Sequence, residues 1–244
     1  MTGVQTCALP ISDTLADIQS IQQAIRRLSR IEREDLAEWI LNSQIFDVGI
    51  KEPALAYGGR RLLTVEEYLA LAEDIVIRHE YVAGQIFPMT SPVVRHEAIA
   101  SNLLFRFQSQ LRGSPCMALS SRTKVRMRLD QDDIFYMPDV TVFCGPLTEE
   151  MLDQQYLTDP CVLVEVLSAS TEAIDRREKA LNYRRIPSLE EYLLVAQRKM
   201  EVTILRRSEN WIPQVLTAPQ DVYESRAVEV NITLADIYEG VRSN

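Results

Sequence analysis

Two apolar stretches that each contain a single acidic residue constrain the fold of this chain most. They run from Ile134 to Phe143 and from Cys161 to Leu167, and both are rich in aliphatic and aromatic side chains. Short apolar runs bounded by Asp, Gly and Pro predict buried β-strands. Asp139 and Glu165 interrupt these strands, and a carboxylate is costly to bury unless it is paired or holds a cation. On neighbouring strands the two acids can share one divalent ion, and Mg²⁺ suits such hard oxygen ligands.

A helix that carries a lysine is predicted after the second strand. The segment Ser168–Thr171 offers N-cap residues, and the helix is expected to continue to about Arg185. Asp175, Lys179 and Tyr183 recur every four residues, so they share one face of this helix. If that face turns toward the strand end, Lys179 lies beside the metal. The alternative is an ordinary surface pair of Asp175 with Lys179, which contributes only about 0.3–0.5 kcal/mol.

The order of these residues resembles a known nuclease superfamily. Met137-Pro138-Asp139, then Glu165-Val166-Leu167, then Lys179 resembles the PD-(D/E)xK pattern, in which a bent strand and its neighbour carry the acids. The stretches YMPDVTVF, PCVLVEVLSAST, DRREKALNYRRIPSLEEYLLV and RHEYVAGQI are similar to a bacterial restriction endonuclease family of the Uma type, over roughly Leu63 to Val241. The superfamily usually has its lysine two residues after the second acid, where this chain has Leu167. Lys179 is therefore the candidate replacement.

The resemblance implies a DNA endonuclease that hydrolyses phosphodiester bonds with Mg²⁺, or with Mn²⁺ in its place. Asp139 and Glu165 would bind the metal with help from the Val166 carbonyl. Lys179 would orient or activate the attacking water and neutralise charge that develops on the phosphate. The fold class implied is α/β, a restriction-endonuclease-like core with a mixed central sheet flanked by helices. Hydrophobic periodicity alone predicts only a mixed α/β domain.

Two further residues are implied to lie near this site. Glu80 is on the first of two strands predicted around a tight turn at Ala83-Gly84. An exposed strand acid is the alternative interpretation. His96 lies near the start of a helix predicted from Val94 to Arg112, with Gly113 as its C-terminal signal. It is either a core histidine with a satisfied hydrogen bond or, as the resemblance implies, a contact to the scissile phosphate or to a metal-bound water.

The charge of the chain argues against a generic nucleic-acid binder. The formal net charge is −9 at pH 7, whereas phosphate neutralisation by cations dominates affinity for nucleic acids. Arg122, Lys124, Arg126 and Arg128 alternate with other residues, so a strand would place all four on one face as candidate DNA contacts. A solvated face is the alternative. The acidic charge also motivates a second hypothesis, a catalytically silent nuclease-like module for DNA binding or dimerisation.

Residues before the nuclease-like stretch divide into three parts. The segment 1–12 matches the translation of a common sequencing-library adapter, so we expect it to be an assembly artefact and not a targeting segment. Helical spacing predicts a helical hairpin arm over 13–50, followed by a linker over 51–62 and the nuclease-like domain over 63–244. The arm is interpreted either as a partner-binding element that forms a homodimer or as a cap on the domain.

Membrane association and zinc binding are not expected from the composition. No run of about 18 apolar residues occurs, which argues against a membrane partner. Cys116, Cys144 and Cys161 show no CxxC or paired spacing, and the chain has only two histidines. A structural zinc site is therefore not expected, and a reduced, cytoplasmic setting is. After the predicted helix that carries Lys179, strands are predicted in EEYLLVA, MEVTILR and WIPQVLT, with a closing helix over Leu234 to Tyr238.

Overall fold

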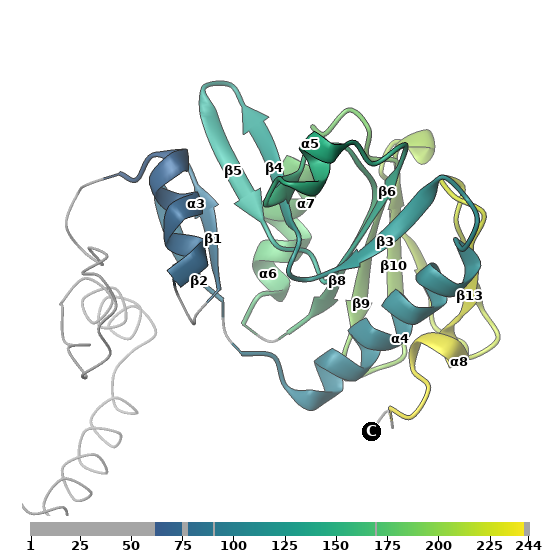
Figure 1. Cartoon of the computed structure of the whole chain (residues 1–244). Helices are drawn as coiled ribbons and strands as arrows, with labels where there is room; N and C mark the ends of the chain where they lie inside the picture. Colours follow the sequence, from purple (N-terminus) through teal and green to yellow (C-terminus); the bar gives the residue numbers. More distant parts are fainter. Residues whose placement is uncertain (1–61, 75–77, 90, 169, 242–244) are drawn as a thin grey trace, which may run out of the picture. The chain divides into compact units, whose positions relative to one another are not determined.

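Three β-sheets form the framework of the part of the chain that the computed structural model describes, residues 62–74, 78–89, 91–168 and 170–241. The adapter-like stretch, the predicted arm and all of the linker except its last residue lie outside these residues. The largest sheet has the strand order β11-β10-β9-β8-β6-β3, the second has the order β2-β1-β5-β4-β7, and β12 pairs with β13 (Figure 1).

The strand bounds are as follows. The six-stranded sheet contains β3 (Cys116–Ser120), β6 (Val140–Cys144), β8 (Pro160–Leu167), β9 (Glu191–Ala196), β10 (Val202–Arg206) and β11 (Gln214–Leu216). The five-stranded sheet contains β1 (His79–Val82), β2 (Gln85–Pro88), β4 (Lys124–Leu129), β5 (Asp132–Tyr136) and β7 (Tyr156–Leu157). The small sheet consists of β12 (Val222–Glu224) and β13 (Asn231–Thr233).

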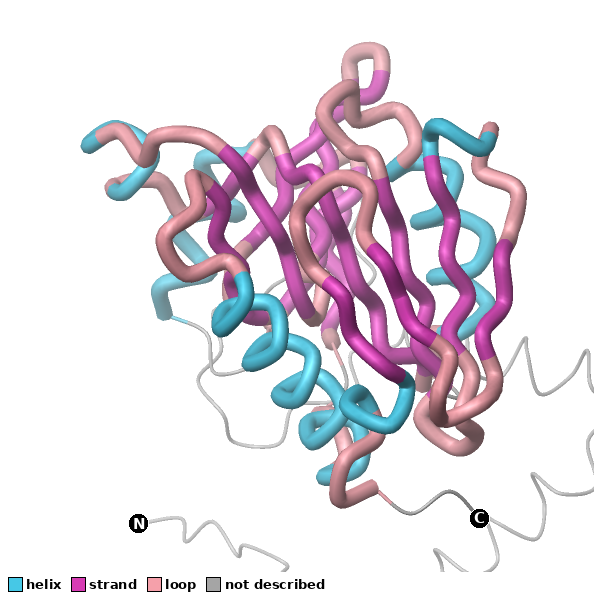
Figure 2. The backbone as a smooth tube through the Cα atoms, turned by 90° about the vertical axis from the view of Figure 1, so that its right-hand side faces the viewer, coloured by secondary structure: helices cyan, strands magenta, loops and turns pink. Residues whose placement is uncertain are grey.

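Helices flank the sheets on both sides (Figure 2). The helical segments are α3 (Val65–Asp74), α4 (Val94–Gln110), α5 (Glu149–Leu152), α6 (Glu172–Ile174), the π-helical turn η1 (Asp175–Lys179), α7 (Ala180–Tyr183), the 3₁₀ turn η2 (Arg207–Glu209) and α8 (Leu234–Ile237). Strand β8 runs parallel to β9, whereas β6, β3 and β10 pair antiparallel with their neighbours. The sheet is therefore mixed, and the helical segment from α6 to α7 forms the crossover between its two parallel strands.

Two apolar cores lie on opposite faces of the six-stranded sheet. On one face α4 and α8 pack with β12 and β13 against alternate residues of the strands, such as Val164 and Val166 of β8. On the other face Leu163 and Leu167 pack against α7 and against residues of β4 and β5. Because side chains alternate along a strand, Glu165 falls on the second face, toward α7. As a result, the Glu165 side chain points toward the helical segment that carries Lys179.

The first acidic strand of the prediction is two strands and not one. The stretch Ile134–Phe143 divides into β5, in the five-stranded sheet, and β6, in the six-stranded sheet. Met137–Asp139 connects them, and Pro138 accounts for the break because its nitrogen has no hydrogen to donate to a ladder. The single-strand prediction was wrong here. The break places Asp139 at the start of β6, where the two sheets meet.

Local signals at the start of the domain are confirmed. The Thr64 hydroxyl accepts from the Glu67 backbone N–H, and the Glu67 carboxylate accepts from the Thr64 N–H, which is a reciprocal cap on α3. Ala83 and Gly84 both have positive φ, as the tight turn between β1 and β2 requires. A Cβ at position 84 would also lie 2.7 Å from the Leu62 Cβ, so glycine satisfies both demands.

The predicted basic strand forms, but its cations have different surroundings. Arg122 lies in the turn before β4 and is exposed, as is Arg128. Lys124 is buried, and its ammonium donates to the Gln155 side chain. Arg126 pairs with Asp133 at 2.8 Å and donates to the Tyr156 hydroxyl. The expectation that all four cations lie on one strand face was therefore wrong for Arg122, and two of the other three have internal partners.

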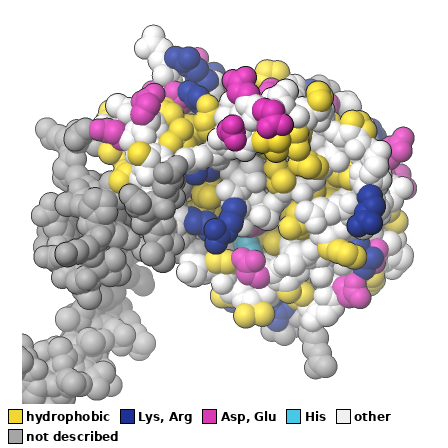
Figure 3. All heavy atoms as spheres, viewed as in Figure 1, with side chains coloured by type: hydrophobic (Ala, Val, Ile, Leu, Met, Phe, Trp, Pro, Cys, Tyr) yellow, Lys and Arg dark blue, Asp and Glu magenta, His cyan; other side chains and the backbone are white. Residues whose placement is uncertain are grey.

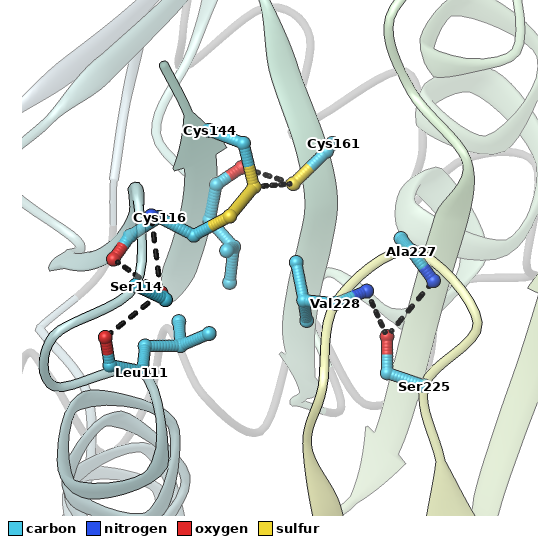
Figure 4. Close-up of a disulfide and its surroundings, with 9 residues drawn as sticks. Leu111, Ser114, Cys116, Cys144, Cys161, Ser225, Ala227 and Val228 are labelled. Atoms are coloured by element: carbon cyan, nitrogen blue, oxygen red, sulfur yellow. Dashed lines mark hydrogen bonds between the residues drawn. A yellow bond between two sulfur atoms is a disulfide. The ribbon is translucent and has the colours of Figure 1, made fainter. Parts of the chain in front are cut away.

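A disulfide joins two neighbouring strands at one edge of the six-stranded sheet. Cys116 of β3 and Cys144 of β6 lie directly opposite each other and are bonded, and the Cys161 sulfur of β8 lies 3.4 Å from the Cys144 sulfur (Figure 4). The spacing of the cysteines did not indicate this bond, because strand pairing brings together residues that are 28 positions apart. Disulfides are typical of oxidising compartments, so this bond does not support the reduced setting, and the compartment stays a prediction.

Candidate active site

A hydrogen bond between strands brings the two predicted acids together. The Asp139 Oδ2 atom accepts from the Val166 backbone N–H at 2.7 Å. The β6–β8 ladder ends with Val140 opposite Val164, so Asp139 takes the place of the next ladder partner. Because Val166 directly follows Glu165, this bond holds the two acids at the same end of adjacent strands.

Glu165 is a buried carboxylate with donors on one oxygen. Its Oε1 atom accepts from the Lys179 ammonium at 3.1 Å and from the Tyr183 hydroxyl at 3.0 Å. Among the described residues, no donor reaches the other oxygen, Oε2. Burial raises the pKa of Glu165 well above its ordinary value, the charge of Lys179 lowers it, and the charges of Asp175, Asp139 and Glu80 raise it further. A cation added beside this carboxylate would therefore stabilise its charged form.

Lys179 lies on a helical segment that is irregular at the site. The predicted helix runs from Glu172 to Tyr183, and its middle turn, η1, is π-helical, a rare geometry that is frequent at functional sites. The Lys179 ammonium contacts three carboxylates, Glu80 at 2.8 Å, Glu165 at 3.1 Å and Asp175 at 3.3 Å. Burial lowers the pKa of Lys179, but these carboxylates outweigh it and raise the pKa well above its usual range. The lysine is therefore a buried cation, and the surface-pair interpretation does not hold.

Glu80 reaches the site from the other sheet. It lies on β1, and its Oε1 atom accepts from the Met137 N–H at 3.2 Å as well as from Lys179. Its side chain is only 14% exposed, so it is not the exposed strand acid of the alternative interpretation. The five-stranded sheet thus contributes one carboxylate to a cluster that is otherwise built on the six-stranded sheet and its crossover helix.

His96 contacts the first acid from helix α4. The His96 Nε2 atom lies 2.9 Å from Asp139 Oδ1. Burial lowers the pKa of His96, but the hydrogen bond and charge of Asp139 outweigh it, so the pKa is raised. The Nδ1 atom is buried without a hydrogen-bond partner in the described part of the chain. The histidine is thus a neighbour of the site with one unsatisfied ring nitrogen.

Two site residues, Asp175 and Tyr183, were recognised from sequence only as sharing a helix face with Lys179. Both are fully buried and both contact the cluster. Burial raises the pKa of Asp175, although Lys179 counteracts it. The four-residue spacing was the signal that could have identified them. Tyr136 had no signal of this kind, yet its ring lies 5.3 Å from the Lys179 ammonium, which is cation–π distance.

The charges of the cluster suit an added divalent cation. Glu80, Asp139, Glu165 and Asp175 supply four carboxylates. Among the described residues, Lys179 is the one lysine in the cluster, and it contacts Glu80, Glu165 and Asp175 but not Asp139. Across the residues described, no three His, Cys, Asp or Glu side chains are already arranged to hold a metal ion by themselves. Magnesium does not need such a set, since one or two carboxylates suffice when waters and phosphate oxygens complete its shell. The donor chemistry therefore fits this metal.

The surface on the side shown in Figure 3 carries both signs of charge. A histidine, basic side chains and acidic side chains lie next to one another near the middle of this face (Figure 3).

No helix within the described ranges is long and apolar enough to cross a membrane.

The fold and this arrangement of acids and lysine define a restriction-endonuclease-like domain. A solved structure of a "putative nuclease belonging to DUF820" from Anabaena variabilis superposes with a TM-score of 0.58 at 18% identity, over 72% of this chain and 97% of that chain. The model of the Uma2 family, described as "Putative restriction endonuclease", matches residues 65–235. The chain belongs to the Uma2 family, as the motif resemblance predicted.

Two relatives from Synechocystis sp. are similar in sequence. Uncharacterized protein slr1290 is 33% identical over 181 residues, which are 73% of this chain and 93% of that protein. Uncharacterized protein sll1609 is 28% identical over 137 residues, which are 56% of this chain and 76% of that protein. Both similarities extend over most of the relative's length.

Proposed function

We propose that this protein is a magnesium-dependent DNA endonuclease that hydrolyses phosphodiester bonds, with Mn²⁺ able to replace Mg²⁺. The observation that carries the proposal is the bond from Val166 to Asp139, which sets two acids side by side, together with the Lys179 ammonium 3.1 Å from the second acid. Two carboxylates with a lysine beside them are suited to holding a divalent cation next to a phosphate.

Asp139, Glu165 and the Val166 carbonyl would hold the metal. Within a strand the N–H and C=O groups of one residue point to the same side. The Val166 N–H points to Asp139, so its carbonyl oxygen is expected on that side too, beyond the end of the β6–β8 ladder. When bound, magnesium would supply Lewis-acid polarisation of the phosphate and a lower pKa for water.

Lys179 would orient the attacking water and balance negative charge that develops on the phosphate. Its contacts with Glu80 and Asp175 would keep the ammonium in place when Glu165 binds a metal. His96 would orient Asp139 through Nε2, whereas its Nδ1 atom is buried and is not placed to contact the scissile phosphate. In the hydrolysis, the oxygen of water forms a bond to phosphorus and releases a proton to solvent, while the bond to the leaving ester oxygen breaks and that oxygen takes up a proton from solvent.

The DNA would be held by the basic residues around β4. Arg122 and Arg128 are exposed and are the members of the predicted set best able to reach a phosphate backbone. Lys124 and Arg126 would instead stabilise β4 and its surroundings and would not contact DNA, since both have partners within the domain.

The test is calorimetric titration of Mn²⁺ and Mg²⁺ into the full chain, followed by cleavage of supercoiled plasmid DNA with each metal. We expect Asp139→Asn to abolish both metal binding and cleavage, because it removes a ligand charge. Glu150→Gln, a change at an exposed acid on α5, is the matched control and should leave both intact. Metal-dependent cleavage that survives Asp139→Asn would refute the assigned roles. DNA binding without metal binding or cleavage by the wild type would instead support the silent module.

A further inference from the structure

Tyr183 is a buried polar residue of the site for which the proposed chemistry has no role. Its side chain is inaccessible to solvent, and its hydroxyl donates to Glu165 Oε1 at 3.0 Å. The ring is fixed by edge-on contacts with Tyr136 and Tyr192, at centroid distances of 5.5 and 5.1 Å. The hydroxyl therefore has little freedom to find another acceptor.

The donors on Glu165 are distributed unequally between its two oxygens. Each carboxylate oxygen has about two lone-pair sites, and Oε1 uses both of them for Lys179 and Tyr183. Oε2 receives no donor from the residues that the structure describes. One oxygen is thus saturated by the protein, and the other keeps its lone pairs for a ligand.

A second buried glutamate in the same sheet shows the contrasting arrangement. Glu191 accepts from Arg206 and the Arg226 N–H on Oε1, and from the hydroxyls of Tyr223 and Ser225 on Oε2. All of its lone-pair sites are used within the protein, as expected for a carboxylate with a structural role. Both glutamates have a basic residue and a tyrosine as partners, but only Glu165 has an oxygen without donors.

We propose that Tyr183 is a positioning residue that occupies Glu165 Oε1 so that Oε2 faces the metal ion. This inference rests on the proposed metal-dependent function and adds a residue to it. Lys179 alone cannot fix the carboxylate in this way, because its ammonium is shared with Glu80 and Asp175 and lies closest to Glu80, at 2.8 Å. The tyrosine has Glu165 as its acceptor and a ring that cannot shift, so it sets the orientation of the carboxylate.

The test compares Tyr183→Phe with Tyr223→Phe in the full chain by calorimetric titration of Mn²⁺. Each change removes one buried hydroxyl from a buried glutamate, so both variants should melt at a lower temperature than the wild type. Loss of a residue that orients a metal ligand typically weakens metal affinity by about 10–100-fold. We expect a weakening of that order for Tyr183→Phe and unchanged affinity for Tyr223→Phe.

Each outcome separates this inference from the function on which it rests. If the wild type binds Mn²⁺ and Tyr183→Phe binds it equally well, the positioning role is refuted while the metal site stands. An equal weakening in both variants would also refute it, because the effect would then be general destabilisation. If the wild type binds no Mn²⁺, both proposals fail. Should Tyr183→Phe melt near the assay temperature, the titrations are run in sucrose, which favours the folded state.

Discussion

The Lys179 ammonium is the one positive charge in contact with Glu80, Glu165 and Asp175 among the residues described. Removal of one partner from a buried ionic cluster leaves the other charges uncompensated, which typically costs about 3–5 kcal/mol. We therefore predict that Lys179→Met lowers the free energy of unfolding by about that amount at pH 8, as measured by urea denaturation. Lys199→Met is the control, because Lys199 is 65% exposed in its pair with Glu201 and exposed pairs contribute little.

The destabilisation caused by Lys179→Met should depend on pH. Burial already raises the pKa values of Glu165 and Asp175, and Lys179 is the group that lowers both. Without the lysine these pKa values rise further. An acid with a raised pKa in the folded state destabilises the fold above that pKa, and this penalty disappears as the pH falls through it. The loss should therefore be smaller at pH 5 than at pH 8, and a loss equal at both pH values would contradict the uncompensated-charge explanation.

At the scale of elements, β3 and β6 are linked covalently as well as by hydrogen bonds. The disulfide between Cys116 and Cys144 joins residues 28 positions apart, and a loop of this size is expected to stabilise the fold by about 3.5 kcal/mol. We predict that a reducing agent lowers the urea midpoint of the wild type. Cys144→Ser should be less stable and should not respond to reduction. An identical midpoint for the wild type with and without reductant would show that the bond contributes nothing.

Strand β8 places a third cysteine beside this bond. Burial raises the pKa of the Cys161 thiol to about 11, and only the thiolate reacts readily with alkylating agents. We predict that iodoacetamide modifies Cys161 slowly at pH 8, and that the rate increases about tenfold per pH unit toward pH 10. Mass spectrometry of the non-reduced protein measures this rate, with free cysteine as the reference. A rate at pH 8 that equals the reference would contradict the raised pKa.

At the scale of the whole molecule, the proposed function requires a chain with a net charge of −9 to bind DNA through local cations. Arg128 is exposed, whereas Arg126 is held by Asp133 and Tyr156. We predict that Arg128→Ala weakens DNA binding and reduces the slope of log affinity against log salt by about one, without a change in stability. Arg126→Ala should lower the free energy of unfolding by about 2 kcal/mol, because a charged hydrogen bond is lost. Filter binding across a salt series and urea denaturation distinguish the two variants.

Local patterns in the sequence predicted several elements correctly and indicated three residues of the candidate site. The capping box at Thr64, the turn at Ala83-Gly84 and the apolar strand around Glu165 formed as predicted, because each depends on neighbours within a few positions. The acids and the lysine were recognisable because charges in apolar strands, and a fixed spacing on a helix, are visible without a fold.

Contacts between distant segments were decided only by the tertiary structure. The chain leaves the five-stranded sheet at Pro138 and enters the six-stranded sheet. Glu80, on the five-stranded sheet, therefore lies close enough to pair with Lys179. Strand pairing, and not spacing, created the disulfide between Cys116 and Cys144. Burial, charge compensation and bonding between remote residues depend on which surfaces pack together. The sequence by itself therefore determined the kinds of groups at the candidate site, and packing decided which of their atoms have partners within the described part of the chain.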